Sequence, residues 1–194
     1  MIGITTLKLP LETLLAAGKR EGSFEATRTT QPQCYDDHPM PLPEELLQEF
    51  QTFSRTAPTV QSVMERIAQR LHEKMARYNW VGFYLVDPAD SNFLLVGPFV
   101  GSFTPHARIP LNRGLCGATA SSGQTVVVQD VATDPRYLAG SSMVNSEIVV
   151  PIFVKNKLAA ELDIESYFAG TFNRSEQDFV EDCAAIVGKY LGKA

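Results

Sequence analysis

Apolar residues recur at helical spacing in two stretches that bracket the middle of the chain. Steps of three and four residues predict an amphipathic helix from about Pro58 to about Tyr78 and a second helix at the C-terminal end. Asn173 is placed to cap the second helix, with Glu176 three residues later. The first stripe consists of Val60, Val63, Met64, Ile67, Leu71 and Met75, and the second of Phe179, Cys183, Ile186, Val187, Tyr190 and Leu191.

Between these helices, aromatic and branched residues form strand-like runs. WVGFYLV (80–86) and FLLVGPFV (93–100) predict one hairpin, and EIVVPIFV and LAAELDIES predict another around the turn KNK. The segment 108–123 predicts a loop and a short helix that ends at Gly123, and TVVVQDV (125–131) predicts a short strand. Paired strands between terminal helices indicate an α+β fold, an antiparallel sheet with helices on one face. Loops over the other face would enclose a small-ligand cavity.

Composition narrows the classes of partner and the domain organisation. The 194 residues are 44% hydrophobic and 20% charged, with a formal net charge of −5. An acidic chain without a basic run is a poor nucleic-acid binder, and no apolar stretch is long enough to span a membrane. Residues 1–43, with four prolines in their last 17 positions, predict an arm or linker with one short helix at most. We expect one domain over 44–194.

Cysteine and histidine usage predicts a reduced, metal-free protein. Three widely spaced cysteines suit the cytoplasm better than a disulfide framework, and polar residues interrupt the N-terminal apolar stretch where a signal peptide needs continuity. The three histidines form no metal-binding cluster. An all-carboxylate site for magnesium or calcium is a weak alternative, and we expect no cofactor.

Strand alternation gathers rings and acids on one face of the sheet. Trp80 and Tyr84 share a face of their strand, Asp163 and Glu165 point away from the core about 7 Å apart, and Glu147 joins them. No Lys or Arg occurs in these runs. Carboxylates in a partly closed site need a cation, and an ammonium ligand with cation–π contacts fits. The alternative is a solvated sheet face that binds nothing.

Cys116 and His106 are the remaining candidates for chemistry. Cys116 lies in RGLCGAT near the start of the short helix, where the helix dipole favours a thiolate; the alternative is a small buried packing residue. His106 lies in a loop that can overhang the cavity. It is either a base for Cys116 or a surface histidine.

Five motifs in order, NWVGFYL, LVGPFVG, RIPLNRGLCG, NSEIVVPI and LDIES, resemble the GAF-domain family over about residues 58–191, and most closely its free methionine-R-sulfoxide reductases. The resemblance implies the fold described above and a pocket for free methionine sulfoxide. It implies that Trp80 and Tyr84 enclose the methyl end and that Glu147, Asp163 and Glu165 hold the amino group. The last position is typically Asp in the family.

The same resemblance implies three cysteine positions, at which this chain has His106, Cys116 and Gly140. In the family the third cysteine forms the sulfenic acid and the first resolves it. Two of the three thiols are therefore missing. The first hypothesis is a catalytically degenerate relative that binds an amino-acid-like ligand. The alternative is an active reductase that uses Cys116 with an external thiol such as thioredoxin. GAF domains often pair through their terminal helices, which implies a homodimer.

Overall fold

The computed structural model describes residues 43–101 and 106–193. The predicted N-terminal arm and its short helix lie outside these ranges, and the boundary at residue 43 stays a prediction. No helix in the described ranges is long and apolar enough to cross a membrane.

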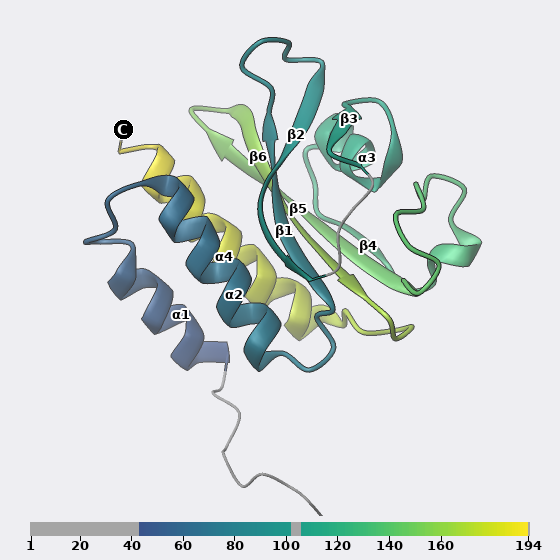
Figure 1. The fold of residues 1–194 in the computed structure, drawn as a ribbon, viewed down its shortest axis with the longest axis horizontal. Helices are drawn as coiled ribbons and strands as arrows, with labels where there is room; N and C mark the ends of the chain where they lie inside the picture. The colour runs from purple at the N-terminus through teal and green to yellow at the C-terminus, as the bar shows by residue number, and fades with distance from the viewer. Residues whose placement is uncertain (1–42, 102–105, 194) are drawn as a thin grey trace, which may run out of the picture. The chain divides into compact units, whose positions relative to one another are not determined.

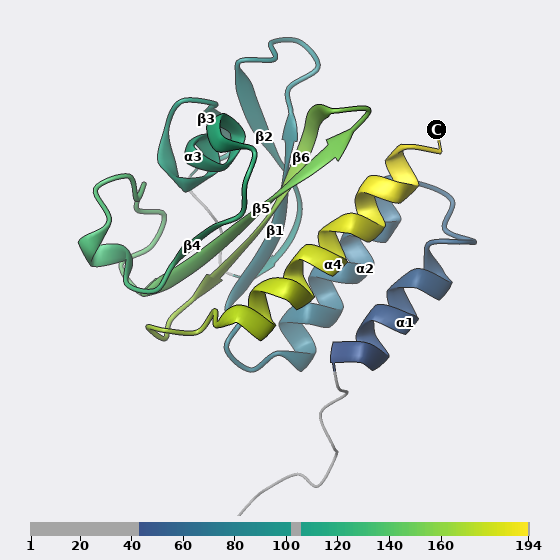
Figure 2. The same ribbon diagram turned by 180° about the vertical axis from the view of Figure 1, so that it is seen from behind.

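Six strands form one sheet in the order β3-β2-β1-β6-β5-β4, and every neighbouring pair is antiparallel. Figures 1 and 2 show α2 and α4 side by side across one face, with α1 against them, while α3 lies over the other face. The predicted α+β architecture is confirmed. The strands are β1 Trp80–Val86, β2 Phe93–Gly101, β3 Arg108–Pro110, β4 Val126–Val128, β5 Ser146–Val154 and β6 Lys157–Ser166. The helices are α1 Pro43–Phe53, α2 Val60–Lys74, α3 Gly114–Ser122, the short 3-10 helix η1 Val131–Thr133 and α4 Arg174–Leu191.

The sheet separates two hydrophobic clusters, as strand alternation predicts. Val81 and Phe83 of β1 face the helices and pack in the larger cluster with Leu162 of β6. Trp80 and Tyr84 lie in the smaller cluster, under α3 and the loops. The larger cluster is the main hydrophobic core, and the smaller one lies beside the acidic residues of β5 and β6.

Helix ends follow local capping. The Asn173 side chain accepts a hydrogen bond from the Glu176 backbone N–H at 3.0 Å, as predicted for the start of α4. The prediction that the first amphipathic helix reaches Tyr78 was wrong, because Met75 adopts an extended backbone conformation and α2 ends at Lys74. Met75 and Tyr78 continue the apolar stripe because both still pack against the core beyond the helix end.

The β5–β6 hairpin sets the register of the acidic residues. Its turn residues Lys155 and Asn156 both have positive φ, which suits a tight two-residue turn. The resulting register pairs Glu165 of β6 with Glu147 of β5 on one side and with Trp80 of β1 on the other. Ring and carboxyl side chains from three strands therefore stand beside one another.

Candidate functional site

The row of residues on β6 that faces α3 forms the base of the site. Next to the Glu165 pairs, Asp163 lies opposite Gly82, and Glu161 lies opposite Tyr84. Directly opposed residues on antiparallel strands have Cβ atoms only about 5 Å apart. The pairing therefore brings the carboxyl groups of β6 against the aromatic residues of β1, with Glu147 of β5 on the other side of Glu165.

A cavity of about 20 Å³ lies above this row, which is room for about one water molecule. It brings together most of the sequence-predicted site residues, with β3, α3 and the loop before β5 completing its wall. Its lining residues are Tyr84, His106, Ile109, Gly114, Leu115, Cys116, Leu138, Glu147, Asp163 and Glu165.

Trp80 is the predicted site residue outside that lining. Its ring stacks on Phe99 with centroids 5.6 Å apart and lies 6.2 Å from the Tyr84 ring. The ring lies over Gly82, where a Cβ atom would come within 2.2 Å of it. Glycine is therefore required at position 82 for this placement of Trp80.

Burial makes the carboxyl groups hard to ionise. It raises the pKa of Glu161 to about 8 and that of Glu165 to about 7. Burial, followed by repulsion from the neighbouring acids, raises the pKa of Glu147 and Asp163 well above their usual ranges. No Lys or Arg is among the residues that line the cavity. A cation that entered would stabilise the ionised acids and displace protons from them.

Glu161 is a member of the acidic group that the sequence analysis missed. The signal was present, because Glu161, Asp163 and Glu165 alternate with the core residues Leu162 and Ile164 along β6.

Several polar atoms at the site lack a hydrogen-bond partner within the described part of the chain. They are both carboxyl oxygens of Glu161, Oδ1 of Asp163 and Nε1 of Trp80. Buried polar groups in folded proteins are nearly always paired, and exceptions call for an explanation. These atoms are available to a ligand or to ordered water.

Cys116 lies in the cavity wall at the third residue of α3, as predicted for the start of the short helix. Its Sγ atom lies 3.8 Å from Oδ2 of Asp163. Of the two interpretations of Cys116, its burial favours the neutral packing residue over the thiolate. Burial, followed by repulsion from Asp163, Glu161 and Glu147, raises the pKa of the thiol well above its usual range. These effects outweigh the helix N-terminus.

His106 joins two loops across the cavity. Its Nε2 lies 3.0 Å from the carbonyl oxygen of Ala139, and its own carbonyl accepts a hydrogen bond from the Tyr84 hydroxyl at 3.1 Å. The side chain therefore overhangs the cavity, as the sequence analysis expected. Gly140, at the third cysteine position implied by the resemblance, directly follows Ala139.

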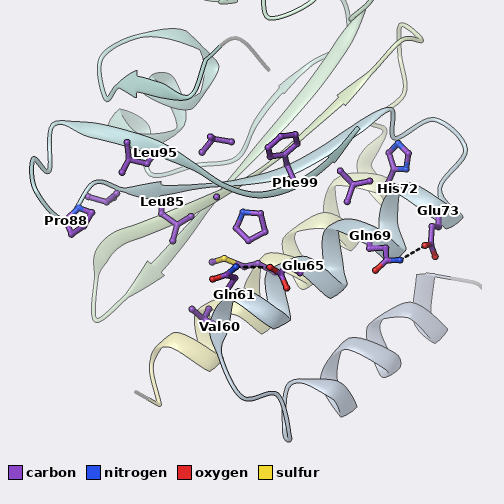
Figure 3. Close-up of a pocket in the computed structure, with 16 residues that line it drawn as sticks. Val60, Gln61, Glu65, Gln69, His72, Glu73, Leu85, Pro88, Leu95 and Phe99 are labelled. Carbon is purple, nitrogen blue, oxygen red and sulfur yellow. Dashed lines mark hydrogen bonds between the residues drawn. The ribbon is translucent and has the colours of Figure 1, made fainter. Parts of the chain in front are cut away.

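A larger groove of about 1300 Å³ lies on the other face of the sheet, between α2 and the β1–β2 hairpin (Figure 3). Its rim carries Gln61–Glu65 and Gln69–Glu73 hydrogen bonds of 2.8 Å, over an apolar floor. None of its ionisable side chains is fully buried. We therefore place the candidate site at the smaller acidic cavity, where burial changes the chemistry of the side chains.

Metal binding has no geometric support in residues 43–101 and 106–193. Among them, no group of three or more His, Cys, Asp or Glu side chains is arranged to hold a metal ion.

Comparison with known proteins identifies the family of the chain. A model of the GAF domain matches residues 59–191. Free methionine-R-sulfoxide reductase of Escherichia coli is 35% identical over 121 residues, which cover 62% of this chain and 71% of the relative. The Saccharomyces cerevisiae protein of the same name is 34% identical over 112 residues, covering 57% and 62%. The structure of free methionine-R-sulfoxide reductase from Neisseria meningitidis in complex with its substrate superposes with a TM-score of 0.72 at 34% identity, covering 77% of this chain and 87% of that one.

Proposed function

Because the chain belongs to the GAF domain family, we propose that it binds a small, amino-acid-like molecule through an ammonium group, in the acidic cavity between the sheet and α3. The observation that carries this proposal is the set of buried carboxyl groups without a cationic neighbour in the cavity lining. A desolvated acid without a partner is costly, and an ammonium group with three donors relieves that cost.

The aromatic side chains support the same class of ligand. Tyr84 lines the cavity, and Trp80 lies beside it. An ammonium or another polarised group over such rings gains cation–π attraction, which is stronger in a desolvated site. The closed cavity holds only about one water molecule, so it has to open before a ligand of this class enters.

The relatives favour an amino acid as the ligand. Two curated relatives are named free methionine-R-sulfoxide reductase, and the Neisseria meningitidis structure is a complex with its substrate. We propose that this chain keeps the binding half of that activity. His106 and Gly140 stand where the resemblance places cysteines, and neither supplies a sulfur atom.

Calorimetric titration with both epimers of methionine sulfoxide, methionine and other free amino acids tests this function. We expect one site per chain, and we expect Glu147→Gln or Asp163→Asn to weaken binding by about tenfold or more, the value of a charge-assisted hydrogen bond. Glu65→Gln, at an exposed position of α2, is the matched control. Absence of both heat and thermal stabilisation with every amino acid would contradict the proposal.

A second candidate function follows from the position of Cys116 in the cavity wall, beside Asp163. In this alternative, the Cys116 sulfur attacks the sulfoxide sulfur and takes its oxygen. The cysteine becomes a sulfenic acid, and the sulfoxide becomes a thioether. Two equivalents of an external thiol then restore Cys116 and release water. Turnover with dithiothreitol or thioredoxin that Cys116→Ser abolishes would favour this alternative; equal slow rates in both proteins would exclude Cys116 as the reductant.

We further propose a homodimer in the cytoplasm. The support is the apolar pattern of the terminal helices, the cysteine usage, and the pairing habit implied by the family. Light scattering at micromolar concentration is the test, and a monomer there would contradict the dimer.

A further inference from the structure

Glu161 is not among the carboxyl groups that line the cavity. It is 0% exposed, and neither of its carboxyl oxygens has a hydrogen-bond partner in the described part of the chain. A buried carboxyl without partners is expensive, and such groups concentrate where a ligand completes them. Apart from the Cys116 thiol, a weak donor, the described part of the chain supplies no partner for the Glu161 carboxyl.

One ammonium group is already satisfied without Glu161. It has three N–H donors, and Glu147, Asp163 and Glu165 line the cavity as three acceptors. Once these three bonds form, no donor remains for a fourth carboxyl. The Cys116 thiol is the polar neighbour of Glu161, but it is a weak donor and meets Oδ2 of Asp163 in the structure.

The position of Glu161 along β6 defines where a second donor would lie. Glu161 is two residues from Asp163 on the same face, so their Cα atoms are about 7 Å apart. Across the sheet it is paired with Tyr84, which lines the cavity, and it lies four residues along β6 from Glu165. The ring of Tyr84 adds a cation–π surface at the same place.

We propose that the ligand carries two ammonium groups about 7 Å apart, one held by Glu147, Asp163 and Glu165 and the other by Glu161. Alkane diamines with four or five carbons and amino acids with an amino side chain have this spacing. The Cys116 side chain has to turn aside to admit the second group, which requires rotation about a single χ1 bond. This inference rests on the proposed function, because it names the ligand class of the same site.

Matched ligands separate this inference from the proposed function. Calorimetric titrations would compare 1,5-diaminopentane with pentylamine, and lysine with norleucine, at about 0.15 M salt, which screens nonspecific attraction to the acidic surface. We expect the wild type to bind each diammonium ligand about tenfold or more tighter than its monoammonium partner. Glu161→Gln and Glu161→Val should abolish this preference and leave the affinity for norleucine within about threefold of the wild-type value.

The outcomes distinguish the diammonium inference from the proposed function. Equal affinity for the diammonium and monoammonium ligands, or a preference that survives in both Glu161 variants, would overturn this inference while leaving an amino-acid site intact. No binding of any amine or amino acid would overturn the proposed function as well. Glu65→Gln should keep the full preference, and far-ultraviolet circular dichroism checks that both Glu161 variants are folded.

Discussion

Sγ of Cys116 lies 3.8 Å from Oδ2 of Asp163, so the N-terminal turn of α3 presents its thiol to a carboxyl group of β6. A helix N-terminus favours a thiolate by up to about 2 kcal/mol. Here that effect is opposed by full burial and by three acidic neighbours, which together raise the pKa of the thiol. Burial and the acidic neighbours therefore favour the neutral thiol over the thiolate at Cys116.

We predict that Cys116 reacts with iodoacetamide at pH 8 at least tenfold more slowly in the folded protein than in urea, since each unit of raised pKa lowers the thiolate fraction tenfold. Mass spectrometry of the Cys116 peptide measures the rate. The pH profile separates charge from access: with a raised pKa, the rate keeps increasing above pH 9, whereas restricted access alone gives a plateau near the ordinary thiol value. Equal folded and unfolded rates would refute the prediction.

The sequence predicted the sheet and its two faces because alternation along a strand depends on local geometry alone. Val81 and Phe83 were separated correctly from Trp80 and Tyr84 in this way. The protonation of Cys116 could not be predicted, since it depends on carboxyl groups that are 31 or more residues away in the chain.

Two helices were predicted less well than the strands. The helix α1 was not predicted, although Leu46, Phe50 and Phe53 follow helical spacing and pack in the larger cluster. The end of α2 was placed too late because packing beyond the helix continues its apolar pattern. For α2 the tertiary contacts of Met75 and Tyr78, which an apolar pattern cannot distinguish from helical packing, extend the pattern beyond the helix.

We predict that the unliganded protein becomes less stable as the pH rises from 6 to 8. The folded-state pKa values of Glu161, about 8, and Glu165, about 7, lie above the ordinary glutamate value of 4.5. The folded state therefore binds more protons than the unfolded state, and its stability decreases as the pH rises through these values. Each such group contributes a slope of up to about 1.4 kcal/mol per pH unit, which urea unfolding at several pH values measures.

Other titratable groups face Glu161 and Glu165 from the surrounding strands, helix and loop. They are Glu147 of β5, Cys116 of α3, Asp134 and Tyr137 of the loop before β5, and Asp163 of β6. Asp134 differs from the other four groups, whose pKa values are raised. The hydrogen bond from Arg136 lowers the pKa of Asp134, so this carboxyl stays ionised between pH 6 and 8. Glu161→Gln should reduce the slope. Stability that is constant or increases between pH 6 and 8 would show that the acids are ionised in the folded state.

We predict that Gly82→Ala destabilises the protein by about 1–3 kcal/mol, the usual cost of overpacking, and weakens ligand binding. The added Cβ would lie 2.2 Å from the Trp80 ring and 2.7 Å from Cβ of Phe99, so the ring has to leave its stacked position. Trp80 is the only tryptophan of the chain, and its fluorescence reports the displacement directly. Gly188→Ala in α4, where the nearest atom is 3.4 Å away, is the control. Unchanged emission and melting temperature in Gly82→Ala would contradict this view of the site.

The hydrogen bond between His106 and Ala139 predicts how ligands enter. With room for about one water molecule, the cavity has to open before a ligand binds, and the 3.0 Å contact from Nε2 of His106 to the Ala139 carbonyl joins the two loops that have to separate. Loss of one such hydrogen bond changes a free energy by about 0.5–1.5 kcal/mol. His106→Ala should therefore increase the association rate constant about three- to tenfold, measured by stopped-flow fluorescence of Trp80. His72→Ala, on α2 across the sheet, should leave that rate constant unchanged. If His106→Ala slows association instead, the histidine guides the ligand into the cavity rather than holding the loops closed.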